Sequence, residues 1–366
     1  MNLLLQVIAW SIPLIIVSWV LPKKYVLLSQ ILITAIFILY QSPISLFLLT
    51  FISFGNFYIL HKSKWSNSIK ITLSLSLLIL LISVAKILFS IDENWVMPLG
   101  LSYYAFRNIH YTLEYYKGKI QNENILFYLA YNFFLPVFII GPIHRYQDFI
   151  KDWHRRRFNA EFFSMGFEHI VYGIAKIVIL GNYLLTSRGK LFVDDLPEKY
   201  IWLKAYLETL RFALNAYFQF AGFSDVAIGI SLLLGFRIIE NFNYPFLATN
   251  MQAFWTRYHI SLSTFCKDYI YTPITSFYRK PMLGMLFTML IIGLWHEVSL
   301  RYLIWGVIQM LGIYLSSVIQ LKSDSILLKN LCRLAVLSFF ALSCVVISQP
   351  TLADAWAVYK ILFFIN

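Results

Sequence analysis

The chain is poor in charged residues and in cysteine. Asp, Glu, Lys and Arg make up 13% of its 366 residues, about half of the roughly 25% that is usual in soluble domains. The three cysteines, Cys266, Cys332 and Cys344, show neither metal-ligand spacing nor a pattern of pairs. The sequence therefore argues against a disulfide framework and a metal centre, and it predicts no soluble domain.

Long hydrophobic runs take the place of the missing charge. Hydrophobic residues make up 59% of the chain, and the segments long enough to span a membrane, or nearly so, are 3–21, 26–40, 43–60, 69–91, 97–113, 124–141, 164–186, 200–221, 282–296, 300–320, 327–347 and 352–365. We expect an all-α polytopic transmembrane helical bundle of about 11 spans, forming one domain over residues 1–366. The first run lacks a basic n-region and is followed by Pro22-Lys23-Lys24, so we expect a transmembrane helix there and not a cleaved signal.

The net charge of +12 comes from basic residues in short loops. Cytoplasmic loops carry such an excess under the positive-inside rule. No basic helix or RNA-binding motif accompanies the charge, so we expect no nucleic-acid partner. The run HRRRF at 154–158 is expected to face lipid phosphates from a solvated loop, and docking of an acidic carrier protein is the alternative.

The loop charges also predict an irregular segment. Lys117 and Lys119 should be cytoplasmic, as should the basic run 144–157, yet only the segment 124–141 separates them. Asp92-Glu93 is expected outside. If 97–113 crosses and brings Lys117 to the cytoplasm, a second crossing by 124–141 would place the basic run 144–157 outside, so the two segments cannot both be full spans. Pro136 and Gly141-Pro142 interrupt the second segment, so we expect it to enter the membrane and return. Irregular backbone at membrane depth requires burial in protein or a water-filled cavity, and we therefore expect re-entrant segments around a central tunnel.

His296 is the first candidate functional residue. It follows 282–295, fourteen residues without a charge, and ionisable residues at membrane depth usually mark functional sites. Its side chain should lean over Ile292 and Gly293, where we expect open volume. A neutral imidazole there can take a proton from a hydroxyl. The alternative is a structural histidine that hydrogen bonds a backbone carbonyl.

His259 is the second candidate, in the polar and aromatic zone 235–276. We expect a helix from Thr249-Asn250 to about Tyr271, which would place Trp255, His259 and Ser263 on one face along the cavity. His259 would then act at the site directly or hold the irregular segment by hydrogen bonding. Glu297 lies four residues before Arg301, which predicts an ion pair between them.

Five sequence blocks in order resemble the membrane-bound O-acyltransferase family, over roughly 98–316. They are PLGLSYYAFRNIHYTLEYYKGKI (98–120), GPIHRYQDF (141–149), FQFAGFSDVAIGISLLLGFRIIENFNYPF (218–246), FWTRYHISLS (254–263) and GLWHE (293–297). The match is to the bacterial branch, which includes proteins of alginate O-acetylation and of teichoic-acid D-alanyl transfer. The sequence departs from the family's usual Trp-His-Gly at Glu297, and Tyr258 replaces the common Trp before the second histidine.

The resemblance implies a catalytic role for His296 and a second functional role for His259. It implies a ring of helices around a tunnel that joins a cytoplasmic donor to an acceptor on the far side. The expected substrate-binding and tunnel residues are Trp255, Asn243, Ser263, Trp295, Gly293 and Arg145. We expect no bound cofactor and no metal.

The expected activity is transfer of a small acyl group, most simply acetyl, to hydroxyls of an exported polysaccharide or cell-envelope glycan. The donor would be a thioester, acetyl-CoA or an acyl carrier protein, at the cytoplasmic face of a bacterial inner membrane. An extracytoplasmic transferase is a further expected partner, besides membrane lipids. The alternatives are D-alanyl transfer to teichoic acid, or a non-catalytic transporter or flippase of a small anion or lipid-linked sugar.

Overall fold

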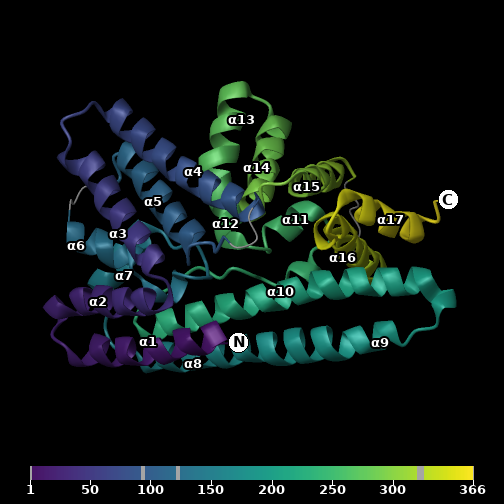
Figure 1. Ribbon diagram of the computed structural model, residues 1–366, viewed down its shortest axis with the longest axis horizontal. Coiled ribbons are helices and arrows are strands. Elements are labelled where there is room, and N and C mark those ends of the chain that lie inside the picture. Colours follow the sequence, from purple (N-terminus) through teal and green to yellow (C-terminus); the bar gives the residue numbers. More distant parts are fainter. Residues whose placement is uncertain (1, 92–94, 121–123, 320–324, 366) are drawn as a thin grey trace. The chain divides into compact units, whose positions relative to one another are not determined.

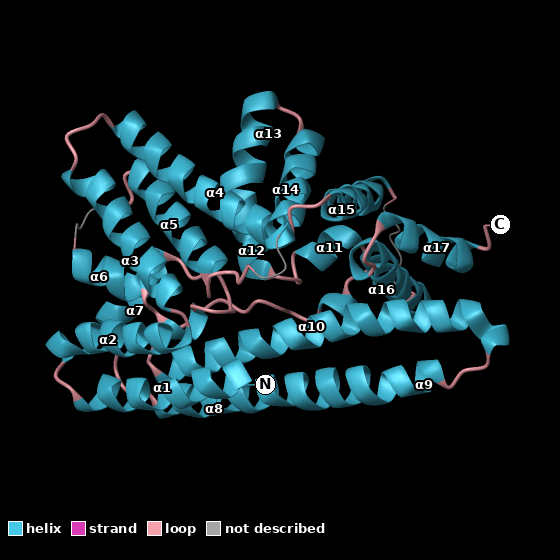
Figure 2. Cartoon of the chain, viewed as in Figure 1, coloured by secondary structure: helices cyan, strands magenta, loops and turns pink. Residues whose placement is uncertain are grey.

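The computed structural model describes residues 2–91, 95–120, 124–319 and 325–365, and these residues fold into helices and connecting loops without a β-strand (Figures 1 and 2). The predicted external position of Asp92-Glu93 falls outside the described residues. Among the residues described, seven helices are long and apolar enough to cross a membrane. The protein is therefore an all-α polytopic membrane protein. The expected number of about 11 spans stays a prediction, because several of the apolar segments form shorter or broken helices.

The contacts divide the chain into two units: residues 1–172 with 223–239, and residues 173–222 with 240–366. The boundary falls inside two long helices, α8 (Ala160–Ala175) and α10 (Ile201–Leu233). Each unit is thus assembled from two stretches of sequence. The expectation of one domain over residues 1–366 stays a prediction.

The first unit contains the N-terminal helices. They are α1 (Asn2–Val20), α2 (Lys23–Gln41), α3 (Pro43–Phe57), α4 (Asn67–Ile91), α5 (Leu101–Tyr116), α6 (Ile125–Asn132) and α7 (Tyr146–Arg155). The α2–α3 boundary follows from local chemistry, since Ser42 caps α3 by accepting a hydrogen bond from the Ser45 backbone N–H and Pro43 occupies the first turn. A π-helical turn at Tyr58–Lys62 extends α3.

The predicted break in segment 124–141 is confirmed. Helix α6 ends at Asn132 after eight residues, and a 3₁₀ turn at Leu135–Val137 leads into irregular backbone up to α7. The fully buried Arg107 of α5 satisfies this backbone, because its guanidinium donates to the carbonyls of Tyr131, Asn132 and Val137 at 2.7, 3.1 and 2.8 Å. One buried cation therefore replaces the hydrogen bonds that a continuous helix would have supplied.

The second unit contains the remaining helices. They are α9 (Lys190–Asp194), α11 (Met251–Trp255), α12 (Ile260–Cys266), α13 (Thr272–Tyr278), α14 (Pro281–His296), α15 (Leu300–Val318), α16 (Ile326–Ser348) and α17 (Leu352–Phe363). π-Helical turns lie at Lys176–Gly189 and Lys267–Tyr271. A long loop connects α10 to α11, as Figure 2 shows, and the candidate site is built on its second half.

Candidate functional site

His259 lies where the backbone changes direction between two short helices. Its φ of +48° is in the left-handed region, and it forms the N-cap of α12, four residues after α11 ends at Trp255. The prediction of one continuous helix carrying Trp255, His259 and Ser263 on one face is therefore wrong. A right-handed helix cannot contain a left-handed residue, and non-glycine residues adopt this conformation rarely, often at functional positions.

A second segment of chain holds this bend by antiparallel pairing. The Asn243 N–H donates to the Arg257 carbonyl at 2.9 Å, and the Ile260 N–H donates to the Asn241 carbonyl at 2.9 Å. These bonds lie on either side of His259 and fix the direction of its backbone. The polar composition of the zone thus reflects the pairing of two irregular segments.

The Asn241 side chain orients the imidazole of His259. Asn241 is fully buried, and its Oδ1 lies 3.2 Å from His259 Nδ1, 3.2 Å from the Ser261 backbone N–H and 2.8 Å from Ser261 Oγ. A backbone N–H can only donate, so the shared atom must be the amide oxygen. His259 Nδ1 therefore carries the proton in the neutral ring, and Nε2 carries a lone pair.

The His259 ring is enclosed by aromatic side chains. Only 3% of the residue is exposed, with the ring of Phe220 at 4.6 Å and that of Trp295 at 5.7 Å between centroids. Within the described part of the chain, Nε2 has no hydrogen-bond partner. An unsatisfied buried acceptor costs about 1–3 kcal/mol, and such a group in a folded protein is a candidate for binding a ligand.

His296 occupies the last position of α14 and is accessible, whereas the sequence suggested a buried side chain. The difference arises because the helix ends at this residue. Three aromatic rings surround the imidazole: Trp295 at 4.5 Å, Tyr302 stacked at 5.8 Å and Trp305 perpendicular at 5.8 Å. Because Trp295 also contacts His259, at 5.7 Å, the two imidazole centroids lie within about 10 Å of each other.

Close packing of α14 on α15 builds this aromatic frame. A Cβ at Gly293 would overlap the Tyr302 carbonyl oxygen, and one at Gly306 would lie 2.6 Å from the Met289 carbonyl oxygen. The expected open volume beside Gly293 is therefore filled by α15. Small residues that let two helix backbones approach are common at membrane helix interfaces. Here they place Tyr302 and Trp305 beside the histidine.

Glu297, which follows His296, is paired with a cation. Its Oε1 lies 3.0 Å from Arg301 Nη2, which confirms the predicted i,i+4 ion pair. Arg301 also donates to the Gln349 carbonyl oxygen. The negative charge that distinguishes this chain from the family's usual glycine is thus balanced locally, by an arginine in the first turn of α15, across the short α14–α15 connection.

A cavity of about 330 Å³ lies in the same unit, between α11, α12, α14 and α15. Its volume is within the range of small-molecule sites. The lining residues are Gln252, Trp255, Thr256, Ile260, Ser263, Thr264, Lys267, Tyr271, Met285, Thr288, Met289, Ile292 and Ile313. Two of the expected tunnel residues, Trp255 and Ser263, are among them. Ile260 follows His259 directly, and Ile292 precedes His296 by one turn.

Gln309 is a site residue that the sequence analysis did not select. It is fully buried on α15, and its Oε1 accepts a hydrogen bond from Trp255 Nε1 at 3.3 Å while its Nε2 donates to Ser343 Oγ at 2.6 Å. The sequence does contain a sign of this role, because Gln309 is a lone amide side chain within the apolar run of α15, and polar residues inside membrane segments usually have a function. Asn241 is also absent from the expected site residues, because nothing local in the sequence indicates that its side chain meets His259.

The other expected site residues have different surroundings. Trp295 is half-buried between the two histidines, and Asn243 is exposed, with its backbone in the pairing beside His259. Arg145 belongs to the first unit, where it is half-buried at the N-cap position of α7.

The second unit thus contains a two-histidine site in a polytopic helical membrane protein. Residues 26–353 match the membrane-bound O-acyltransferase family, and the chain belongs to that family. This agrees with the five sequence blocks and with the position of His296 in GLWHE.

Named relatives include acetyl and D-alanyl transferases. The chain is 30% identical over 276 residues to the probable alginate O-acetylase of Pseudomonas aeruginosa, covering 73% of this chain and 52% of that protein. It is 28% identical to the peptidoglycan O-acetyltransferase of Helicobacter pylori, with 60% and 47% covered, and 28% identical to the teichoic acid D-alanyltransferase of Bacillus subtilis, with 58% and 57% covered. The chain spans about half the length of these relatives.

Proposed function

We propose that this protein is a membrane O-acyltransferase that moves a small acyl group from a cytoplasmic thioester donor to hydroxyls of an exported polysaccharide or cell-envelope glycan. The observation that carries the proposal is the pair of imidazoles joined through Trp295, one accessible and one buried with a free lone pair. Membership of the acyltransferase family supports the same reaction class.

His296 is assigned as the general base. Its accessible ring can meet a hydroxyl group of a large acceptor, and a neutral imidazole accepts the hydroxyl proton as the oxygen attacks. A new C–O bond forms at the thioester carbonyl carbon and the C–S bond breaks. The thiolate leaves with the electron pair, and the proton held by the imidazole passes to the thiolate or to water.

His259 is assigned as a positioning residue for the donor. With the proton fixed on Nδ1 by Asn241, its Nε2 accepts a hydrogen bond and cannot give one. The pantetheine arms of coenzyme A and of acyl carrier proteins carry amide N–H groups that fit such an acceptor. The cavity lined by Trp255 and Ser263 is the proposed space for that arm.

The acyl group is proposed to be acetyl, by analogy with the alginate and peptidoglycan relatives, and D-alanyl is the alternative suggested by the teichoic acid relatives. We place the protein in a bacterial inner membrane. Its proposed partners are the acyl donor or carrier on the cytoplasmic side, the acceptor glycan or a transferase on the far side, and the surrounding lipids.

The test is acyl incorporation into the cell-surface glycan fraction, measured by mass spectrometry in cells that express the native chain, His296→Ala or His259→Ala at equal membrane abundance. His154→Ala, at an exposed position on α7, is the matched control. We expect ester-linked acyl groups with the native chain and the control. We expect them to fall by at least 100-fold with His296→Ala, since general base catalysis contributes about 10²–10⁴-fold.

His259→Ala should raise the donor concentration needed for half-maximal rate more than it lowers the maximal rate, in membranes supplied with acetyl-CoA or acylated carrier. The mass added to the glycan identifies the acyl group. Esters that persist at native levels with His296→Ala would refute the catalytic assignment and favour a transporter or scaffold.

A further inference from the structure

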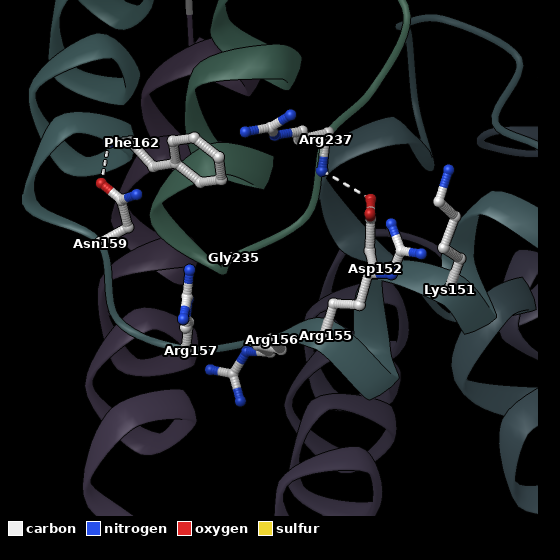
Figure 3. Close-up of a pocket in the computed structure, with 9 residues that line it drawn as sticks. All are labelled: Lys151, Asp152, Arg155, Arg156, Arg157, Asn159, Phe162, Gly235 and Arg237. Atoms are coloured by element: carbon white, nitrogen blue, oxygen red, sulfur yellow. Dashed lines mark hydrogen bonds between the residues drawn. The ribbon is translucent and has the colours of Figure 1, made fainter.

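A second cavity, of about 290 Å³, lies in the first unit, whereas both histidines belong to the second (Figure 3). Three stretches of chain meet there: the end of α7, the turn into α8 and the backbone that follows α10. Its lining residues are Lys151, Asp152, Arg155, Arg156, Arg157, Asn159, Phe162, Gly235 and Arg237. The cavity is open to the surface and predominantly basic.

The charge of the lining is strongly one-sided. Five cationic side chains and one carboxylate leave a formal charge of +4. The carboxylate belongs to Asp152, and its Oδ2 accepts a hydrogen bond from the Arg237 backbone N–H at 2.8 Å. Asp152 therefore anchors the backbone of the third stretch, and the excess of cations remains for an anionic ligand.

Arg156 is fixed in place as part of the wall. Its Nε donates to the Leu234 carbonyl at 2.7 Å, its Nη2 donates to the Ser18 carbonyl at 2.6 Å, and its guanidinium lies 4.1 Å from the Trp19 ring. Gly235 permits this approach, since its φ is +84° and a Cβ there would lie 2.9 Å from Arg156 Cγ. Burial lowers the pKa of Arg156 to about 10, so the side chain stays cationic at neutral pH.

The other basic residues are oriented less rigidly and are available to a ligand. Lys151, Arg155 and Arg157 are exposed, and among the described residues neither arginine has an ion-pair partner. Arg237 is exposed as well, with its guanidinium 4.2 Å from the Phe162 ring. Figure 3 shows these side chains arranged around the opening, on opposite sides of Gly235.

The neighbouring chain places this cavity near a membrane surface. Lys23 is the first residue of α2, at an end of the helix that the positive-inside rule assigns to the cytoplasm, and its ammonium lies over the Trp153 ring at 5.3 Å. Helix α8 begins beside the cavity and forms the start of the candidate span Ala160–Asp194, with Phe167 and Val171 56% and 60% exposed on an apolar face. The basic lining is therefore next to the point where a candidate membrane span begins.

We propose that this cavity is a binding site for a phosphate group. Guanidinium groups match phosphate oxygens in paired, charge-assisted hydrogen bonds, and basic pockets at the cytoplasmic side of membrane helices bind anionic lipid head groups. The proposal does not depend on the acyltransferase mechanism, because none of its residues takes part in that site.

Two sources can supply the phosphate: an anionic phospholipid in the surrounding leaflet, or a soluble phosphate-bearing thioester donor. The exposed apolar face of α8 beside the cavity favours the phospholipid. The experiment below measures both in parallel.

The test compares three forms of the full chain in detergent by native mass spectrometry: native, Arg155→Gln/Arg157→Gln, and Lys24→Gln/Lys64→Gln. The second pair is the matched control, since it also removes two exposed cations, one in the first turn of α2 and one in the loop before α4, and both lie outside the cavity lining. One arm titrates phosphatidylglycerol, which is anionic, with phosphatidylcholine as the zwitterionic reference whose phosphate is balanced by its own choline cation. The other arm titrates coenzyme A. An Arg155→Lys/Arg157→Lys variant separates loss of charge from loss of the guanidinium fork.

We expect the first site for phosphatidylglycerol to weaken by at least 10-fold with Arg155→Gln/Arg157→Gln, and by less than 2-fold in the control. The lysine variant should fall between the two. Weakening of coenzyme A binding in the same pattern, with lipid binding unchanged, would identify the soluble donor as the source of the phosphate. If neither ligand distinguishes the arginine pair from the control, the proposal is wrong.

Discussion

Asn241→Ala is the substitution that tests the orientation of His259 most directly. It removes the single oxygen that accepts from His259 Nδ1 and from the backbone N–H and hydroxyl of Ser261. The main-chain bond from the Ile260 N–H to the Asn241 carbonyl is retained. The substitution therefore releases the imidazole while it leaves the pairing of the two segments in place.

The expected loss of activity and of stability in Asn241→Ala follows from these three hydrogen bonds. Each contributes about 1 kcal/mol net, and a buried donor left unpaired costs about 1–3 kcal/mol. Loss of the bond that fixes the His259 tautomer should therefore reduce acyl transfer by about 10- to 100-fold, at about 1.4 kcal/mol for each factor of ten. The free energy of unfolding should fall by about 3 kcal/mol from all three bonds.

Asn241→Asp gives a signature that a purely structural role would not produce. A carboxylate can accept the same hydrogen bonds, but it also favours the imidazolium form, which has no lone pair on Nε2. Acyl transfer should then recover towards the native rate only as the pH rises, and it should be lost as the pH falls.

The assay is acyl transfer to the glycan across a pH series, at equal membrane abundance of each variant. Thr249→Ala, at an exposed position eight residues further on, is the control and should stay within 2-fold of the native rate. If Asn241→Ala matches this control at every pH, Asn241 does not orient the histidine and the tautomer argument fails.

Two further predictions concern stability. Gly293→Ala should lower the midpoint of thermal unfolding in detergent, because the added Cβ overlaps an α15 carbonyl oxygen and overpacking costs about 1–3 kcal/mol. Gly55→Ala is the control: it has open space around it and should be neutral or stabilising by up to about 1 kcal/mol. Equal midpoints for the two variants would contradict the close approach of α14 and α15. Arg107→Met should destabilise the first unit by about 3 kcal/mol or more, since three buried carbonyls lose their donor. The measurement is the protease resistance of Arg107→Met in membranes, compared with the control Lys64→Met. If Arg107→Met resists proteolysis as well as the control, the three carbonyls have other hydrogen-bond donors and the prediction is wrong.

Much of the architecture could be predicted from composition and loop charge. Low charge and long apolar runs require membrane helices, because only helices satisfy every backbone group within one segment. The loop charges required that either 97–113 or 124–141 does not cross fully, Pro136 and Gly141-Pro142 indicated the second, and α6 does end at Asn132. The number of spans could not be predicted in this way, since hydropathy does not distinguish a crossing helix such as α4 from a broken one such as α6.

The site was predictable where its chemistry is local and unpredictable where it depends on contacts. His296 and His259 were identifiable as ionisable residues in apolar or aromatic surroundings. The Glu297–Arg301 ion pair was predicted from the spacing of four residues, although the pair lies across the α14–α15 connection and not along one helix. The helix expected through His259 was wrong, because pairing with residues 241–243 imposes a left-handed bend that no local pattern encodes.

The sequence by itself determined that the protein is helical and lies in a membrane, that one segment is broken and that two histidines stand out. Only the tertiary structure decided which neighbours those histidines have. It buried His259 against Asn241 and left His296 accessible beside Tyr302 and Trp305. The physical reason is that hydropathy and charge can be read from each residue or segment alone. The tautomer of His259, the close packing of α15 beside Gly293 and the basic cavity each depend on contacts between residues that are separated in the sequence.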